Sequence, residues 1–170
     1  MVRVLALSAA VLVLLSGCGD TRLKTLSGED VSWKQQRGQW VFINYWAQWC
    51  QPCRKEIPEL NQFALQHEGE AVILGVNFDG PEYEELEKQT RAMGIEFTQL
   101  LHDPSGLLGF DRPEVLPATY VFDPKGVYQG VMVGPQTEAS LGAWLKDDPK
   151  LAVIPMAHEL NSAEPIERAQ

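Results

Sequence analysis

The sequence predicts one α/β domain in which a mixed central sheet is flanked by helices. Strand-like apolar runs alternate with segments of helical period in the first half of the chain, and two strand-like segments separated by a turn follow, before a last helix. Parallel strands need long crossovers and antiparallel neighbours need only a tight turn, so this order predicts both kinds of pairing in one sheet. With 45% apolar and 22% charged residues, the 170-residue chain can bury the core of such a domain.

The first half of the chain begins with a short segment at 31–33, which we expect to be an edge strand. Residues 40–45 are β-branched and aromatic and predict a buried central strand. Apolar residues then recur every three or four positions, which predicts a helix over about 52–67. The apolar run 72–77 predicts a strand covered on both faces, and a helix over 82–93 should end at Gly94.

The second half begins with a short extended piece at 98–102, a turn, and a brief helix that leads to residue 110. Residues 119–122 and 127–133 predict a hairpin, because the turn-forming residues 123–126 separate them. Thr137 is a good first residue for a last helix to about 146. We place the domain at 27–147 and a tail without regular structure at 148–170.

The N-terminus has the features of an export signal. Arg3 is followed by an apolar run to Leu15, shorter than the roughly 20 residues that span a bilayer core. Residues 15–18 resemble the lipobox of bacterial lipoproteins, which implies removal of residues 1–17, lipidation of Cys18 and a tether over 18–26. The alternative is an ordinary cleaved signal in which Cys18 has no role. We therefore expect a lipid anchor in the bacterial cell envelope, facing the periplasm; the sequence leaves open which membrane holds it.

The net charge of −9 argues against nucleic acid as a partner. Binding to phosphates requires a basic stripe, and the chain has none.

The motif Cys50-Gln51-Pro52-Cys53 lies where a predicted strand ends and a helix begins. A helix start carries unpaired N–H groups and a partial positive charge, which stabilise a thiolate. An ordinary thiol is only about 3% ionised at pH 7, so this placement would activate Cys50. The sequence predicts a redox-active disulfide in which Cys50 is the exposed nucleophile and Cys53 the buried resolving thiol.

Other uses of this cysteine pair remain as alternatives. A structural disulfide gains little, because closing so short a loop contributes about 2 kcal/mol, against nearly 5 kcal/mol for a hundred-residue loop. Zinc would need a second ligand pair, and the three histidines are scattered. A copper chaperone with Met132, Met156 or a histidine as a third ligand stays possible. A peroxidase would need a Thr/Cys context that the chain lacks.

The stretch from Asn44 to Pro58 resembles the thioredoxin superfamily, and within it the TlpA/ResA-like envelope reductases that include cytochrome c maturation thioredoxins. The resemblance covers residues 26–146 and implies a thioredoxin-like fold. It also implies a protein-disulfide reductase that acts on exported proteins and receives electrons from a membrane donor of the DsbD/CcdA type. We expect a monomer without dissociable cofactor or metal. Asn44 departs from ordinary thioredoxins, which carry a buried aspartate there.

The resemblance also implies further site residues. Glu56 matches an active-site glutamate of the ResA-like members, and burial would raise its pKa and suit it to exchange a proton with Cys53. Its alternative role is to complement the helix dipole. Residues 115–119 resemble the superfamily's cis-proline loop, so we expect a cis Leu116–Pro117 bond and main-chain pairing of Leu116 with substrate. Trp46 and Trp49 would form an apolar rim, with core packing as the alternative for Trp46.

Overall fold

The computed structural model describes residues 19–146, in which a five-stranded sheet has the order β5-β4-β3-β6-β7. Its central strand β3 pairs in parallel with β4, which pairs in parallel with β5. On the other side β3 pairs antiparallel with β6, and β6 with β7. The predicted mixed sheet is therefore confirmed. The strands are β3 (Trp40–Trp46), β4 (Ala71–Asn77), β5 (Thr98–Gln99), β6 (Ala118–Phe122) and β7 (Tyr128–Val133).

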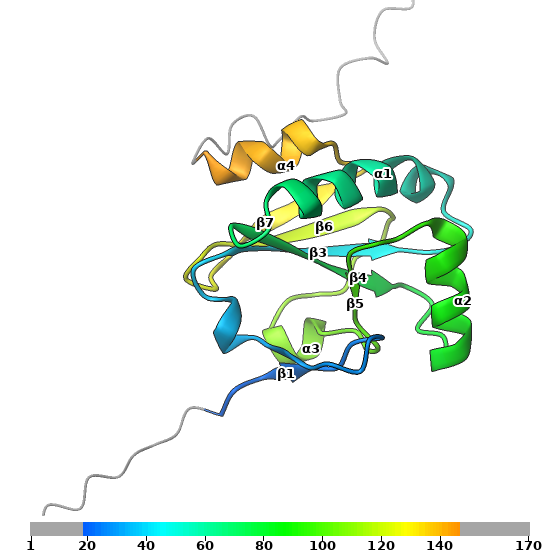
Figure 1. Ribbon diagram of the computed structural model, residues 1–170, viewed down its shortest axis with the longest axis horizontal. Coiled ribbons are helices and arrows are strands. Elements are labelled where there is room, and N and C mark those ends of the chain that lie inside the picture. The colour runs from blue at the N-terminus through cyan, green and yellow to red at the C-terminus, as the bar shows by residue number, and fades with distance from the viewer. Residues whose placement is uncertain (1–18, 147–170) are drawn as a thin grey trace, which may run out of the picture.

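The helices cover both faces of this sheet. Figure 1 shows α1 and α4 together on one face, α3 on the opposite face and α2 at the side. Their bounds are α1 (Gln51–Gln66), α2 (Tyr83–Met93), α3 (Ser105–Leu108) and α4 (Glu138–Leu145). A 3₁₀ turn, η1 (Lys34–Gln36), precedes β3. The predicted helices and strands of the main sheet are all present, each within a few residues of the expected bounds.

The core consists of two apolar clusters, one on each face of the sheet. Side chains alternate along β3, so Phe42 and Trp46 enter the cluster beneath α1 and α4, whereas Ile43 and Tyr45 enter the cluster on the α3 side. Asn44 has the same parity as Phe42 and Trp46. The alternation therefore places one polar side chain on the face that α1 covers.

The N-terminal part of the described chain differs from the prediction. β2 (Val31–Ser32) pairs with β1 (Arg22–Leu23) in a separate two-stranded sheet and is not an edge of the main sheet. Leu23 is buried, and Thr25 forms a bridge with Leu100. Part of the predicted tether is thus folded against the domain, which begins before residue 27. The predicted signal, Cys18 and the tail from 148 lie outside the described residues.

Local sequence determines two helix ends as expected. Gly94 ends α2 in the left-handed conformation, with a φ of 69°. The side chain of Thr137 accepts a hydrogen bond from the Ser140 main-chain N–H and caps α4.

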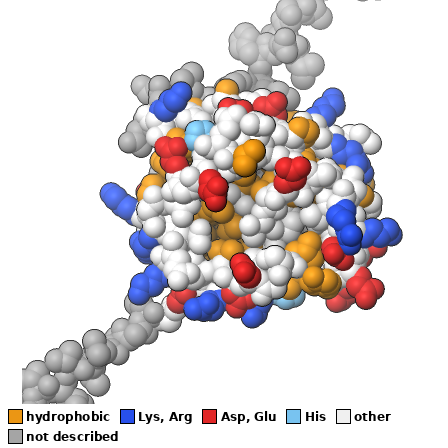
Figure 2. Space-filling model, in the orientation of Figure 1, with side chains coloured by type: hydrophobic (Ala, Val, Ile, Leu, Met, Phe, Trp, Pro, Cys, Tyr) orange, Lys and Arg blue, Asp and Glu red, His pale blue; other side chains and the backbone are white. Residues whose placement is uncertain are grey.

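No helix within residues 19–146 has the length and apolar character to cross a membrane. On the face in Figure 2, Lys and Arg side chains lie mostly around the outline and do not gather into one patch.

Candidate active site

The cysteine motif lies at the start of α1, directly after the central strand. Cys50 is the N-cap residue of the helix, and its Sγ accepts a hydrogen bond from the main-chain N–H of Cys53 at 3.2 Å. Pro52 occupies the first turn, where its missing N–H is not needed. The sulfur of Cys50 therefore lies where the helix presents N–H groups and its positive end.

Cys50 and Cys53 form a disulfide with their Cα atoms 5.3 Å apart. Cys50 is 3% exposed and Cys53 0%, so Cys53 is buried as predicted. The prediction of an exposed Cys50 is wrong for this disulfide form. Its side chain packs in the apolar cluster with Trp46 and Ala47, against which Leu116 also packs.

Glu56 lies one helical turn after Cys53 and is only 1% exposed. Its Oε1 accepts a hydrogen bond from Asn44 Nδ2 at 2.8 Å, and its Oε2 accepts one from the main-chain N–H of Gln136 at 2.9 Å. Burial raises the pKa of Glu56 from 4.5 to about 7, although both hydrogen bonds favour the ionised form. Glu56 is therefore buried as expected, and its role in proton exchange with Cys53 stays a prediction.

Two partners of this carboxylate network were not predicted. Thr119 lies opposite Asn44 in the β3–β6 register, and its Oγ1 accepts a hydrogen bond from Asn44 Nδ2 at 3.0 Å. Gln136 reaches Glu56 through its main chain from the loop after β7. Every residue except proline has a main-chain N–H, so the side chain at a position 80 residues away does not indicate that its main chain donates to Glu56. The departure at Asn44 was the one visible sign of the network.

The two tryptophans near the motif have different environments. Trp46 is 0% exposed and its Nε1 donates to Gln99 Oε1 at 2.8 Å, so its predicted place on the rim is wrong. β3 extends through Trp46, and the strand alternation directs this ring into the core. Trp49 is 63% exposed, as a rim residue requires, and its Nε1 donates to Asp79 Oδ2 at 2.9 Å. Asp79 was not predicted.

The Leu116–Pro117 bond is cis, as expected. The Pro117 carbonyl accepts a hydrogen bond from the Gly134 N–H at 2.9 Å, and β6 begins at the next residue, Ala118. Leu116 is half-buried and packs against the cluster that contains both cysteines. Val115 beside it and Val133 opposite Ala118 are exposed. An exposed apolar surface therefore adjoins the proline loop.

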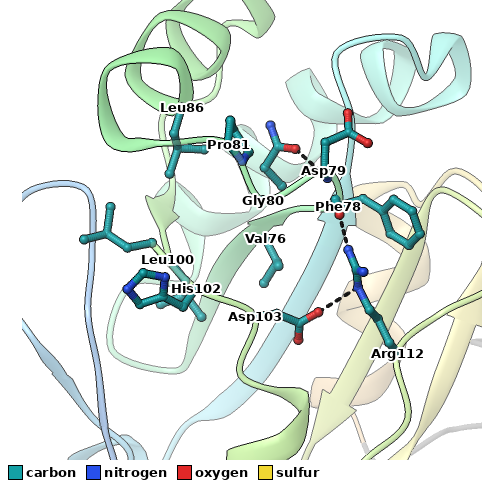
Figure 3. Close-up of a pocket in the computed structure, with 12 residues that line it drawn as sticks. Val76, Phe78, Asp79, Gly80, Pro81, Leu86, Leu100, His102, Asp103 and Arg112 are labelled. Atoms are coloured by element: carbon teal, nitrogen blue, oxygen red, sulfur yellow. Dashed lines mark hydrogen bonds and ion pairs between the residues drawn. The ribbon is translucent and has the colours of Figure 1, made fainter.

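A cavity of about 220 Å³ lies at the carboxyl end of β4. Figure 3 shows Arg112 beside it, joined to Asp103 and to the Phe78 carbonyl. The Arg112 Nε lies 2.9 Å from Asp103 Oδ2, and its guanidinium lies 4.2 Å from the centre of the Phe78 ring. The Phe78 N–H donates to the Trp46 carbonyl at 2.8 Å. Through Phe78 and the adjacent Asp79, this loop is tied to the residues that precede Cys50.

The described residues contain no group of three His, Cys, Asp or Glu side chains arranged to hold a metal. Met132, a third ligand only in the alternative of a copper chaperone, is buried, and its Sδ accepts a hydrogen bond from Trp144 Nε1 at 3.2 Å. Two of the other candidate ligands, Met156 and His158, lie outside the described residues. His67 contacts Glu70, and His102 lines the cavity near β4. Neither histidine makes a hydrogen bond to the cysteines.

Comparisons with known proteins agree with this geometry. A model of the AhpC/TSA family matches residues 18–131. The chain is 35% identical over 125 residues to the thioredoxin-like protein YneN of Bacillus subtilis, with 72% of each chain covered. It is 28% identical over 123 residues to the thiol–disulfide oxidoreductase ResA of Geobacillus kaustophilus, covering 72% of this chain and 70% of that one. The crystal structure of StoA from Bacillus subtilis matches with a TM-score of 0.61 at 26% identity, covering 74% of this chain and 96% of StoA.

Proposed function

The chain belongs to the AhpC/TSA family and has a thioredoxin-like fold, and on that premise we propose that it reduces disulfides of exported proteins. Its relatives are thiol–disulfide oxidoreductases, and the proposal assigns the same chemistry to Cys50 and Cys53. The observation that carries it is the Cys50–Cys53 disulfide at the N-terminus of α1, where Cys50 is the N-cap residue. A structural bridge of this length would add little stability, whereas a helix start activates a thiolate.

The proposed reaction begins from the dithiol form. The Cys50 thiolate attacks one sulfur of a substrate disulfide, forming a mixed disulfide and releasing the other substrate sulfur as a thiolate. Cys53 then loses its proton and attacks Sγ of Cys50, which forms the disulfide seen here and releases the second substrate thiol. The two electrons have moved to the substrate.

Glu56 is proposed to accept the proton from Cys53 in the second step. It lies one turn along the same helix, and its pKa of about 7 is closer to the ordinary thiol value of about 8.5 than that of an exposed glutamate is, and it is near neutral pH. A glutamate with an ordinary pKa would be a weaker base for this transfer. Burial therefore suits Glu56 to exchange a proton with Cys53.

Substrate contact is proposed for Trp49, Leu116 and Pro117. The exposed Trp49 ring, held by Asp79, supplies apolar area beside Cys50. The main chain of Leu116 precedes the paired residues of β6, where an extended segment of substrate could add as a short strand. Trp46 is excluded from this surface because it is fully buried.

The proposed location is the periplasmic face of a membrane in the bacterial cell envelope, with a lipid on Cys18 as anchor. The support is the apolar leader and the lipobox-like residues 15–18. In an oxidising compartment the dithiol must be restored by an electron donor, for which we propose a membrane protein of the DsbD/CcdA type. A monomer with apocytochrome c among its substrates is compatible with this proposal.

The test is reduction of insulin or of a defined peptide disulfide by the purified reduced protein. We expect Cys50→Ala to abolish turnover, and Cys53→Ala to accumulate a mixed disulfide through Cys50, detectable by mass spectrometry. Stoichiometric Cu(I) binding or peroxide consumption without disulfide reduction would overturn the proposal. Equilibration with glutathione measures the reduction potential of the Cys50–Cys53 pair. A potential close to that of strong oxidants would contradict a reductase.

A further inference from the structure

The buried amide of Asn44 uses both N–H groups of Nδ2 on two acceptors. One acceptor is Glu56 Oε1 at 2.8 Å and the other is Thr119 Oγ1 at 3.0 Å. The second Glu56 oxygen accepts from the Gln136 main-chain N–H. Each oxygen of this carboxyl group therefore faces an N–H donor. The arrangement fits an ionised Glu56, which only accepts hydrogen bonds.

The same arrangement does not fit a protonated Glu56. A carboxylic acid has one O–H donor, and both polar neighbours just described are donors too. Leaving an O–H unpaired at a site that is 1% exposed is unfavourable. The Gln136 N–H belongs to the main chain and keeps its direction, but the Asn44 amide can rotate.

A half-turn of the Asn44 amide exchanges oxygen and nitrogen with almost no change of shape. Among residues 19–146, Asn44 Oδ1 has no hydrogen-bond partner, so the rotation breaks no bond of that atom. It would present Oδ1 to both Glu56 and Thr119, at the cost of the two hydrogen bonds that Nδ2 donates in the ionised form. The Thr119 hydroxyl can adapt, because it is a donor as well as an acceptor.

We propose that Asn44 and Thr119 form a proton-linked switch for Glu56. Asn44 turns Nδ2 toward the ionised carboxylate and Oδ1 toward the carboxylic acid, and the Thr119 hydroxyl changes from acceptor to donor. Asn44 is thus a positioning residue that gives both protonation states of Glu56 a hydrogen-bond partner. The inference deepens the proposed proton transfer from Cys53, and it rests on that function only for its catalytic consequence.

Other titratable groups around Glu56 are few in the disulfide form. On α1, Cys53 is in the disulfide and does not titrate, and Glu59 is exposed. At the start of α4, the Glu138 N–H donates to Glu59 Oε2 at 3.1 Å. β3 and β6 contribute the uncharged Asn44 and Thr119, and the loop after β7 contributes a main-chain N–H. The oxidised protein therefore isolates the titration of Glu56.

The experiment is side-chain NMR of the oxidised, isotope-labelled protein from about pH 5 to about pH 9. The Glu56 carboxyl carbon and the Asn44 Nδ2 hydrogens should titrate with one midpoint. Contacts from these hydrogens to Glu56 and Thr119 should be present in the ionised form and lost in the protonated form. Glu56→Gln, which mimics the protonated acid by donating from its amide, should give the second pattern at every pH.

Two substitutions at Thr119 test the direction of the coupling. Thr119→Val leaves one N–H of Asn44 unpaired when Glu56 is ionised, whereas in the protonated form Asn44 Oδ1 keeps the Glu56 O–H as its donor, so the midpoint should rise by about one pH unit. Thr119→Ser keeps the hydroxyl and should leave the midpoint near its original value. An Asn44 contact pattern that does not change with pH, or a Thr119→Val midpoint equal to that of the original protein, would overturn the switch. Because no thiol reacts in this experiment, loss of the proposed reductase activity would leave these results unaffected.

Discussion

Glu56→Gln should change how the stability of the oxidised protein depends on pH. In the folded state burial holds the pKa of Glu56 at about 7, against 4.5 for an ordinary glutamate. The native protein therefore keeps this proton over a range in which the unfolded chain has released it. The contribution of Glu56 to the unfolding free energy should be highest below the unfolded pKa, fall as pH rises toward 7, and level off above it. At 1.36 kcal/mol for each unit of pKa, the total loss is about 3 kcal/mol.

The assay is urea unfolding of the oxidised protein at a series of pH values, with the disulfide intact so that neither cysteine titrates. The original protein should lose about 3 kcal/mol more than Glu56→Gln between the two ends of the series. Glu68→Gln, at an exposed position just after α1, is the matched control and should follow the original protein. Parallel curves for the original protein and Glu56→Gln would refute the claim that burial raises this pKa.

Two further substitutions, the first with a matched control, test the surroundings of the motif. Gly75→Ala would place a Cβ on the buried Gln99 amide that accepts from Trp46, so urea unfolding should show a loss of about 2 kcal/mol. Gly142→Ala in α4 meets no atom within 4 Å and should be neutral or stabilising; an equal loss in both variants would contradict this explanation. Asp79→Ala frees the Trp49 ring, and kcat/KM for a peptide disulfide should fall about threefold to tenfold, with unfolding free energy changed by less than about 0.5 kcal/mol. Unchanged kcat/KM would show that Trp49 needs no fixed orientation.

The order of elements could be predicted because each long element has a clear hydrophobic period. The cysteine motif could be placed because a β-rich run ends just before it. β1 could not be predicted, because a strand of two residues is too short to show a hydrophobic period. The burial of Leu23 depends on contacts that exist only in the folded chain. The sequence alone therefore predicts a tether over residues 18–26.

Side-chain direction and distant contacts limited the prediction of the site. Trp46 and Trp49 both precede Cys50, but β3 extends to Trp46 and directs that ring inward, while Trp49 follows the strand. Asp79 and Gln136 contact the site from loops after β4 and β7, and no motif links them to the cysteines. Glu56 was found through its place one turn after Cys53, whereas its partners required the fold.

The central claim is that the start of α1 holds the Cys50 sulfur ionised in the dithiol form. The most direct measurement is the rate of iodoacetamide alkylation of the reduced protein as a function of pH, with mass spectrometry to identify the labelled cysteine. We predict labelling at Cys50 before Cys53, with a midpoint below the ordinary thiol value of about 8.5. A midpoint at or above that ordinary value, or first labelling at Cys53, would contradict the account.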